Sequence, residues 1–323
     1  MVLVIIGHVV LGSVHDNVIR YSIYAVHMPL FIGLSGYLIN PLSLQNSHFG
    51  AVLARYWRRV LLPFLLAFAF YTGVLLIHAV AEDRLSAARL LSYLHTPYYH
   101  LWFVPTLVIW VLALWAILKL KQPLGLVLSV CVIASLFWAS VPKADQWAVV
   151  APLVSKKVVY FFLFFMFGAY IRRGISPALL STLTRFNGWL MALIGACACV
   201  YLLNIGVNKS PLRGTVWLLM NLSLIAVCVQ AMTRTPTVMA HKTNAISACL
   251  EAMGRNSLPL YLWHVAPLFV LKGLDIHQTH PVLYYLVSSV MIVAICAFIL
   301  KFENKNNTLN RVLYGSANGH SSA

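Results

Sequence analysis

Charged side chains are scarce in this sequence: they make up 9% of the 323 residues, whereas 61% of the residues are hydrophobic. A soluble domain typically has about 25% charged residues. This chain therefore could not cover a surface that faces water, and its mean hydropathy of +0.84 agrees. The composition excludes an ordinary soluble protein and predicts an all-α, polytopic transmembrane helical bundle.

Acidic residues are the scarcest charged group, with 7 Asp and Glu against 23 Lys and Arg. None of them lies deep in an apolar run, which argues against a transporter that relays protons through carboxylates. An excess of basic residues can indicate a nucleic-acid partner. Here they stand singly or in pairs between apolar runs, as residues that set membrane topology do. We expect the lipid bilayer as a partner, and no nucleic acid.

Cysteine pairs with metal-binding or redox spacing are missing. The six cysteines form no CxxC motif, and Cys197 and Cys199 are too close in sequence for a metal knuckle. They are typical of small buried hydrophobic residues. The sequence predicts neither a disulfide framework nor a metal site.

Long apolar runs recur along the chain, and a membrane-spanning helix needs about 20 such residues. The first run, residues 1–11, is only half that length. Either its helix begins inside the bilayer or, as we prefer, the true start of the protein lies upstream of Met1. Counting this run, about ten spans are predicted, near 1–11, 22–40, 60–80, 101–118, 124–141, 158–171, 187–204, 214–232, 257–271 and 282–300.

The basic residues between these spans indicate an orientation. With the amino terminus inside, the larger share of the 23 Lys and Arg residues falls in inner loops, as the positive-inside rule requires. Both termini are then expected to be cytoplasmic, with residues 301–323 as a polar cytoplasmic tail. The longest inner loops are predicted near 41–59 and 233–256.

Histidine is the polar residue that stands out within the spans. His8 lies near the middle of the first span if that span extends upstream. It either packs and donates to a neighbouring carbonyl or, as its depth favours, faces a polar interior where an imidazole can accept a proton. His27 lies at the outer end of its span, where contact with lipid headgroups would also explain it.

The stretch HMPLFIGLSGYL, residues 27–38, gathers several unusual residues in one span. Pro29 costs little in a first helical turn, where the backbone donors have no partner. Gly33 and Gly36 are three residues apart and would give a smooth face for close packing of another helix. Ser35 could donate to a carbonyl one turn back or bind a ligand.

Three arginines, Arg55, Arg58 and Arg59, lie in the inner loop predicted at 41–59. Arg55 and Arg58 would share one face if this segment were helical. Arginines beside a membrane commonly set topology or bind anionic lipid. The alternative is a cytoplasmic phosphate site, because the guanidinium fork matches phosphate oxygens.

Two later stretches combine aromatic and polar residues. His100 and Trp102 lie in YYHLWFVPTL, residues 98–107, most of which an aromatic belt would explain. In GRNSLPLYLWH, residues 254–264, a turn that ends at Asn256 is followed by Ser257 as a predicted helix cap. His264 then lies about two turns into its span.

Taken together, these stretches resemble the acyltransferase-3 family of integral membrane acyltransferases, and most closely its fucose 4-O-acetylase-like members. The resemblance runs along most of the chain, through Gly7-His8, MPLFIGLSGYL, the RxxR pair Arg55 and Arg58, HLWFVPTL and NSLPLYLWH. It implies one membrane acyltransferase domain, residues 1–300. Such a domain moves an acyl group, usually acetyl from acetyl-CoA, onto a hydroxyl of a cell-surface carbohydrate. The implied location is the inner or plasma membrane of the cell.

The resemblance also implies site residues. His8 matches the first-span histidine held essential in the family, Ser35 to Leu38 match its SG[FY]L element, and Arg55 with Arg58 match its arginine motif. The predicted catalytic residues are His8, His27, Ser35 and Tyr37. The predicted acyl-CoA-binding residues are Arg55, Arg58 and Arg59, and those that support the substrate or the interior are His100, Trp102, Asn256 and His264. No permanently bound cofactor is expected, because acyl-CoA is a donor substrate.

The sequence departs from the family in one respect. The family usually has a basic residue eleven positions before the first-span histidine, and here that position would precede Met1. An inert truncated paralogue is therefore one alternative. A permease that exports a glycan or lipid-linked sugar is another. For the enzyme, we expect direct transfer in a ternary complex, and we favour an acylated Ser35 less, because the sequence places no base to activate it.

Overall fold

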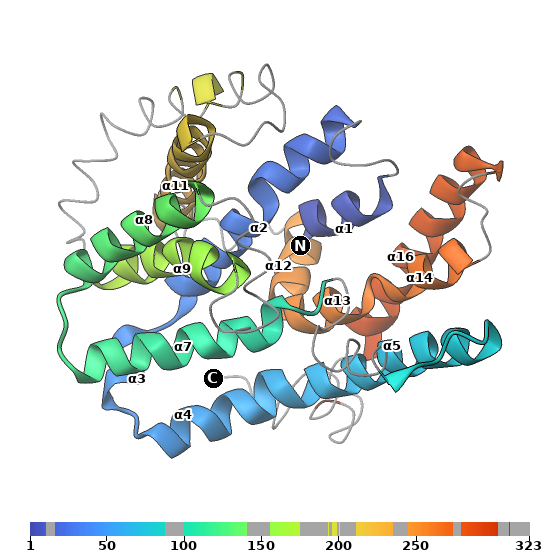
Figure 1. The fold of residues 1–323 in the computed structure, drawn as a ribbon, viewed down its shortest axis with the longest axis horizontal. Helices are drawn as coiled ribbons and strands as arrows, with labels where there is room; N and C mark the ends of the chain where they lie inside the picture. The colour runs from blue at the N-terminus through green and yellow to red at the C-terminus, as the bar shows by residue number, and fades with distance from the viewer. Residues whose placement is uncertain are drawn as a thin grey trace. The chain divides into compact units, whose positions relative to one another are not determined.

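The computed structural model describes residues 1–10, 17–87, 100–140, 156–174, 193, 196–198, 200, 211–234, 245–273, 279–302 and 310 (Figure 1). Within these ranges, every regular element is a helix. The all-α prediction is confirmed. The predicted span 187–204 and the predicted tail lie almost wholly outside the described residues.

Several helices in the described part of the chain can cross a membrane. Four are long and apolar enough: Val18–Leu38, Phe49–Ala81, Leu212–Met232 and Pro281–Lys301. Large apolar side chains project from them, such as Ile77 and Val282, which are 70% and 72% exposed. An exposed apolar surface of this kind is stable only in lipid or against another protein. The prediction of a polytopic helical membrane protein is confirmed.

The chain divides into two compact units. The first consists of Met1–Leu11, His48–Ile109 and Thr243–Ala323, and the second of Gly12–Ser47 and Trp110–Lys242. One helix, α7 (Phe103–Lys119), begins in the first unit and ends in the second.

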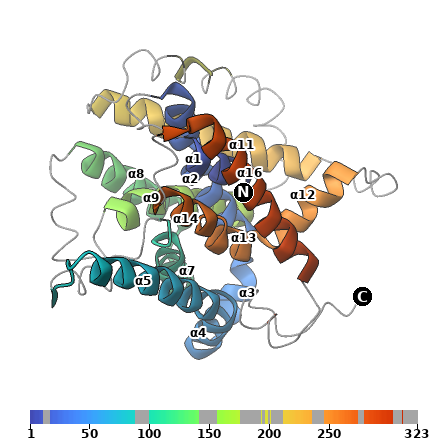
Figure 2. The same ribbon diagram turned by 90° about the vertical axis from the view of Figure 1, so that its right-hand side faces the viewer.

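The first unit is built around α16 (Pro281–Phe302), which packs against α1 (Val2–Val9), α13 (Ser257–Trp263) and α14 (Ala266–Gly273). α13 also contacts α12 (Ala245–Arg255) and α5 (Leu62–Ala81), and Figure 2 shows α13 and α14 beside α16. Side chains of α14 and α16 form its apolar core, with Leu268, Leu271, Tyr284 and Ile292 buried. This core holds α1 in place through Ile5 and Val9.

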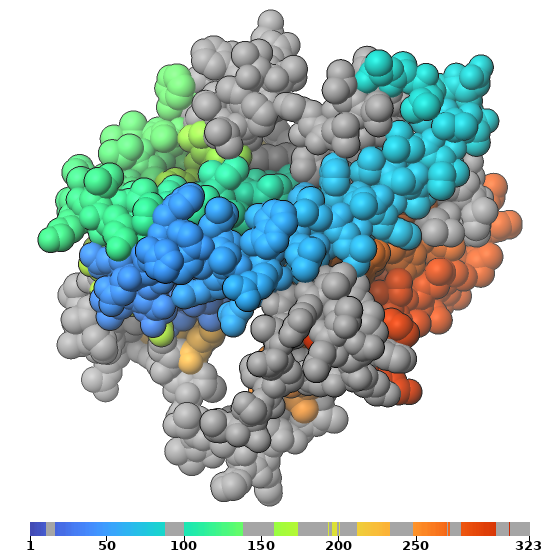
Figure 3. Space-filling model, turned by 90° about the horizontal axis from the view of Figure 1, so that it is seen from below, coloured from blue at the N-terminus to red at the C-terminus, as the bar shows by residue number. Residues whose placement is uncertain are grey.

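The three arginines lie on a helix and not in a loop. α4 (Phe49–Tyr56), a π-helical turn η1 (Trp57–Leu61) and α5 form one continuous helix (Figure 1), and on the face in Figure 3 its side chains lie at the surface. The connection predicted over 41–59 is therefore largely helical. No proline interrupts the segment before Pro63, whose ring would clash with the carbonyl four residues back in a regular helix. The wider π turn, in which Leu62 N–H donates to Trp57 O, accommodates it.

The second unit is a bundle of α2 (Val18–Leu38), α8 (Leu124–Ser140), α9 (Lys156–Gly174) and α11 (Pro211–Arg234), with the short α3 (Pro41–Asn46) after α2. α9 packs against α2 and α8, and α11 contacts all three (Figure 1). Asn40 caps α3 by accepting from the N–H groups of Leu42 and Ser43, both at 3.1 Å.

Glycines bring α2 and α9 into backbone contact. A Cβ at Gly36 would collide with the carbonyl oxygen of Phe165, and a Cβ at Gly168 would collide with that of Gly33. A Cβ at Gly33 would lie 2.5 Å from Cδ1 of Ile225 on α11. The predicted close packing on the Gly33–Gly36 face is confirmed.

The predicted span 257–271 is not one helix. α13 ends at Trp263, and α14 begins at Ala266. Pro267 explains the break, because it has no N–H to donate to the carbonyl of Trp263 and its ring would clash with that carbonyl. The break leaves carbonyls near the end of α13 without N–H donors from their own helix. At membrane depth, such carbonyls are tolerated only where other groups donate hydrogen bonds to them.

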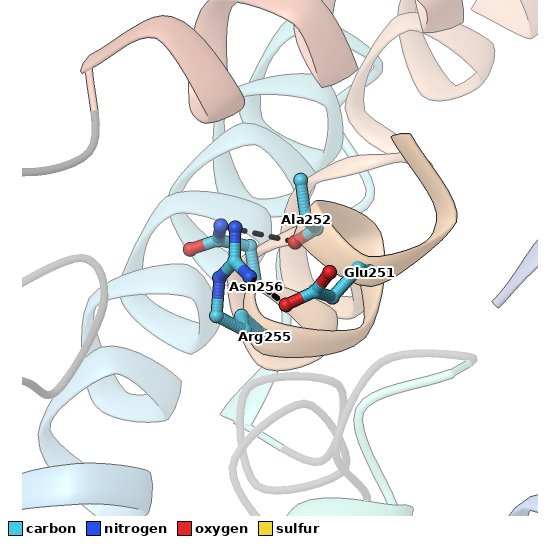
Figure 4. A network of polar contacts seen from close by, with 4 residues as sticks. All are labelled: Glu251, Ala252, Arg255 and Asn256. Atoms are coloured by element: carbon cyan, nitrogen blue, oxygen red, sulfur yellow. Dashed lines mark hydrogen bonds and ion pairs between the residues drawn. The ribbon is translucent and has the colours of Figure 1, made fainter. Parts of the chain in front are cut away.

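The start of α13 also differs from the prediction. Asn256, and not Ser257, occupies the N-cap position, and its side chain makes no capping hydrogen bond. Instead, Asn256 Nδ2 donates to Ala252 O at 3.1 Å, beside the ion pair of Arg255 with Glu251 at 2.6 Å (Figure 4). The turn between α12 and α13 is thus stabilised by bonds of Arg255 and Asn256 to residues of α12.

Candidate active site

Three histidines from distant parts of the sequence meet in the first unit. The ring centroids of His8 and His264 are 5.2 Å apart, those of His100 and His264 are 5.5 Å apart, and those of His8 and His100 are 6.1 Å apart. His264 is fully buried and His100 is 3% exposed, whereas His8 on α1 is half-buried. We call these three residues the histidine cluster.

The break between α13 and α14 explains how the cluster is held. Leu262 O, near the end of α13, accepts a hydrogen bond from Tyr71 OH at 3.0 Å and another from His100 Nε2 at 3.2 Å. Tyr261 OH in turn donates to the backbone carbonyl of His100. Side chains from α5 and from the segment before α7 therefore replace the helical donors that the break removes, and they fix the His100 ring.

His264 stands at the C-terminal cap of α13. Its Nδ1 lies 2.9 Å from Leu260 O and 2.9 Å from Tyr261 O. Its backbone N–H also donates to Leu260 O, at 3.1 Å. These bonds to its own helix hold the ring in one orientation.

The other two predicted support residues lie elsewhere in the first unit. Trp102 is half-buried just before α7, and its ring contacts that of Phe103. Asn256 is 3% exposed and bonds to Ala252, as described above. Asn256 thus stabilises the turn that precedes α13, about two helical turns before His264.

His27 belongs to the second unit. It is 5% exposed, its Nδ1 donates to Ile23 O at 2.8 Å, and its ring packs edge-on against Tyr24 at 4.8 Å. Arg20 in turn lies over the Tyr24 ring, 5.2 Å from its centroid. The side chain is therefore buried in protein and hydrogen-bonded within its own helix.

Ser35 and Tyr37 also lie in the second unit. Ser35 Oγ donates to Phe31 O at 2.8 Å, which is the first of the two partners that the sequence allowed. Tyr37 is 9% exposed, and the guanidinium of Arg172 lies over its ring, 5.5 Å from the centroid. The SGYL element is therefore packed against α9 and its basic C-terminal end.

The three predicted CoA-binding arginines are all exposed. Arg55 is on α4, and Arg58 and Arg59 are on η1. The ion pairs of the described residues involve other arginines, Arg84 and Arg255. The three guanidinium groups are thus available to an anionic ligand.

Two residues of the site were missed by the sequence reasoning. Tyr71 and Tyr261 are buried, and their hydroxyls donate to the backbone around the cluster. A buried tyrosine hydroxyl usually finds a partner, so a tyrosine in an otherwise apolar run is a usable signal. Among the described residues, no group of His, Cys, Asp or Glu is arranged to hold a metal ion.

Comparison with known proteins gives one match. Residues 1–301 match the model of a protein family that is described as an acyltransferase domain, the acyltransferase-3 family. No curated protein matches the chain. No solved structure matches it either.

Proposed function

The chain belongs to the acyltransferase-3 family of membrane acyltransferases, and we propose that it transfers an acetyl group from acetyl-CoA to a hydroxyl of a cell-surface carbohydrate. The observation that carries this proposal is the histidine cluster in the first unit. A neutral imidazole has one donor and one acceptor nitrogen. Grouped imidazoles can therefore accept and hold the proton that such a transfer releases.

His8 is the group that acts on the acceptor. A sugar hydroxyl is a weak nucleophile towards a thioester, and a base that takes its proton in the transition state speeds the attack. His8 is the half-buried member of the cluster, so a substrate reaches it more readily than the buried rings of His100 and His264. The hydroxyl attacks acetyl-CoA directly in a ternary complex, and CoA leaves as the thiol.

The oxyanion of the tetrahedral intermediate needs hydrogen-bond donors. Ser35 and Tyr37 are the proposed donors, with His27 as a further catalytic residue. Ser35 Oγ already donates to Phe31 O, so its hydroxyl would rotate away from that carbonyl to serve the oxyanion.

Arg55, Arg58 and Arg59 bind the phosphates of CoA. Charge-assisted hydrogen bonds between guanidinium and phosphate are short and strong, and all three side chains are exposed. The continuous helix Phe49–Ala81 has 33 residues. At 1.5 Å per residue it is about 50 Å long, against about 30 Å for the hydrocarbon core. A helix of this length extends beyond the hydrocarbon core. Our proposal assigns its arginine-bearing start to the cytoplasmic face of the plasma membrane, where acetyl-CoA is made, with both termini of the chain inside.

The experiment uses the purified protein in lipid nanodiscs with radiolabelled acetyl-CoA and extracted surface polysaccharides. The proposal predicts acceptor-dependent release of CoA and a label on the polysaccharide that mild base removes, as it removes an ester. Release of CoA without labelled acceptor would contradict it. So would passage of the glycan across proteoliposomes without acyl-CoA, which is the result expected of a permease.

A further inference from the structure

The hydrogen bonds of His264 define which of its ring nitrogens carries the proton. Nδ1 lies 2.9 Å from two carbonyl oxygens, of Leu260 and Tyr261. A carbonyl oxygen can only accept, so Nδ1 is the donor and carries the hydrogen. In the neutral ring, Nε2 is then the nitrogen with the free electron pair.

This Nε2 atom is buried and has no hydrogen-bond partner among the described residues. A buried polar atom without a partner costs free energy and is rare in folded proteins. The surrounding structure holds it in place nonetheless, because Tyr71 and His100 fix the carbonyl of Leu262 in the same turn of α13. The fold therefore maintains a basic nitrogen in a protected position.

The rings of His8 and His100 both lie beside that of His264, and the ring of His8 is the nearer of the two. The centroids of the two rings are 5.2 Å apart, and their planes are tilted by 43°. A hydrogen bond between two imidazoles separates their centroids by about 5 Å, from the usual N···N distance and the ring size. The observed separation of 5.2 Å therefore matches that of a hydrogen bond between the rings of His8 and His264.

We infer that His264 is a positioning residue that stores the proton taken from the acceptor, an inference that rests on the proposed acetyl transfer. As the acceptor oxygen bonds to the acetyl carbon, its O–H bond breaks and the proton moves to one nitrogen of His8. The proton on the other nitrogen of His8 moves to Nε2 of His264. The C–S bond of the thioester then breaks, and the CoA thiolate takes one proton back through His8. The cluster is left neutral, with acetylated carbohydrate and CoA thiol as products.

Two substitutions separate storage of a proton from a structural role. In His264→Asn, the side-chain amide can keep the donor to Leu260 O but has no atom at Nε2. In His264→Gln, the amide reaches the Nε2 position but cannot accept a proton there. Both are expected to lower kcat by at least about 100-fold, since general acid–base contributions are of that order, with the KM for acetyl-CoA unchanged. Full kcat in His264→Asn, or recovery of kcat in His264→Gln, overturns the inference.

A control and a second measurement complete the test. His78→Asn changes an exposed histidine of α5 and is expected to keep the wild-type kcat. In ¹⁵N-histidine-labelled protein, the signal that His264→Asn removes should show hydrogen on Nδ1 and none on Nε2. Hydrogen on Nε2 overturns the inference whatever the activity. An inactive wild-type protein with the expected tautomer refutes the proposed function instead, so the two failures are distinguishable.

Discussion

Two buried histidines make the same local contact in different surroundings. His264 in the first unit and His27 in the second each donate from Nδ1 to the carbonyl four residues back. His27 does so inside the unbroken α2, against Tyr24, whereas His264 lies at a helix break, against His8 and His100. In the first unit, polar side chains bond to buried carbonyls near a helix break. In the second, glycines let two helices pack in backbone contact. We therefore expect substitutions in the first unit to change rates, and those on the glycine face of the second to change folding.

The largest expected effect is on folding of the second unit. Gly36→Leu would force a side chain into the carbonyl of Phe165, which is rigid backbone. Overpacking of this kind costs about 3 kcal/mol or more, so we expect aggregation on size-exclusion chromatography and a lowered Tm. Gly125→Leu in α8 is the matched control, because a Cβ there meets nothing within 4 Å. An unchanged Tm in Gly36→Leu would refute the packing described for α2 and α9.

The second prediction concerns donor binding in the first unit. Replacing Arg55 and Arg58 together with alanine should raise the KM for acetyl-CoA at least about tenfold, because a hydrogen bond to a charged group contributes about 1.5–3 kcal/mol. The kcat at saturating donor should change little, and the Tm should be unchanged, since both side chains are exposed. Arg84→Ala, an exposed arginine just past the other end of the same helix, is the control. An equal effect of Arg84→Ala would point to general charge and not to a phosphate site.

The smallest effect is expected for Tyr71→Phe. Its hydroxyl is one of two donors to Leu262 O, and His100 Nε2 keeps the other bond. Loss of one such bond costs about 1 kcal/mol, which thermal unfolding of the purified protein can detect. Tyr285→Phe, on the partly exposed face of α16, should leave the Tm unchanged. A large loss of stability in Tyr71→Phe would mean that the hydroxyl has a role beyond this bond.

Local sequence signals predicted much of the helical framework. The apolar runs at 22–40 and 124–141 became α2 and α8 within a few residues at each end. The glycine spacing in α2 indicated its packing face, because i and i+3 positions share a face whatever the partner is. Each member of the histidine cluster was also noticed separately, since a polar residue in an apolar run is costly.

Contacts between distant segments could not be predicted in the same way. Nothing near His8 in the sequence indicates that His100 and His264 lie beside it, because that proximity depends on how α1, α13 and α16 pack. The sequence left open whether Arg55 to Arg59 are helical, because basic residues between two apolar runs are also typical of a loop. The break after Trp263 was missed because the apolar run around Pro267 was long enough for one span, and the helix-breaking effect of that proline was left out.

The most direct test of the account is a single-turnover measurement with His8→Ala. Purified wild-type and variant proteins are saturated with labelled acetyl-CoA and mixed with the polysaccharide acceptor, and transfer of the label is followed over time. If His8 is the base, the rate is at least about 100-fold lower in the variant, and binding of acetyl-CoA is unchanged. The wild-type rate should also fall once the pH is low enough to protonate the histidine cluster. A variant that transfers acetyl at the wild-type rate would contradict the assignment of the chemistry to this cluster.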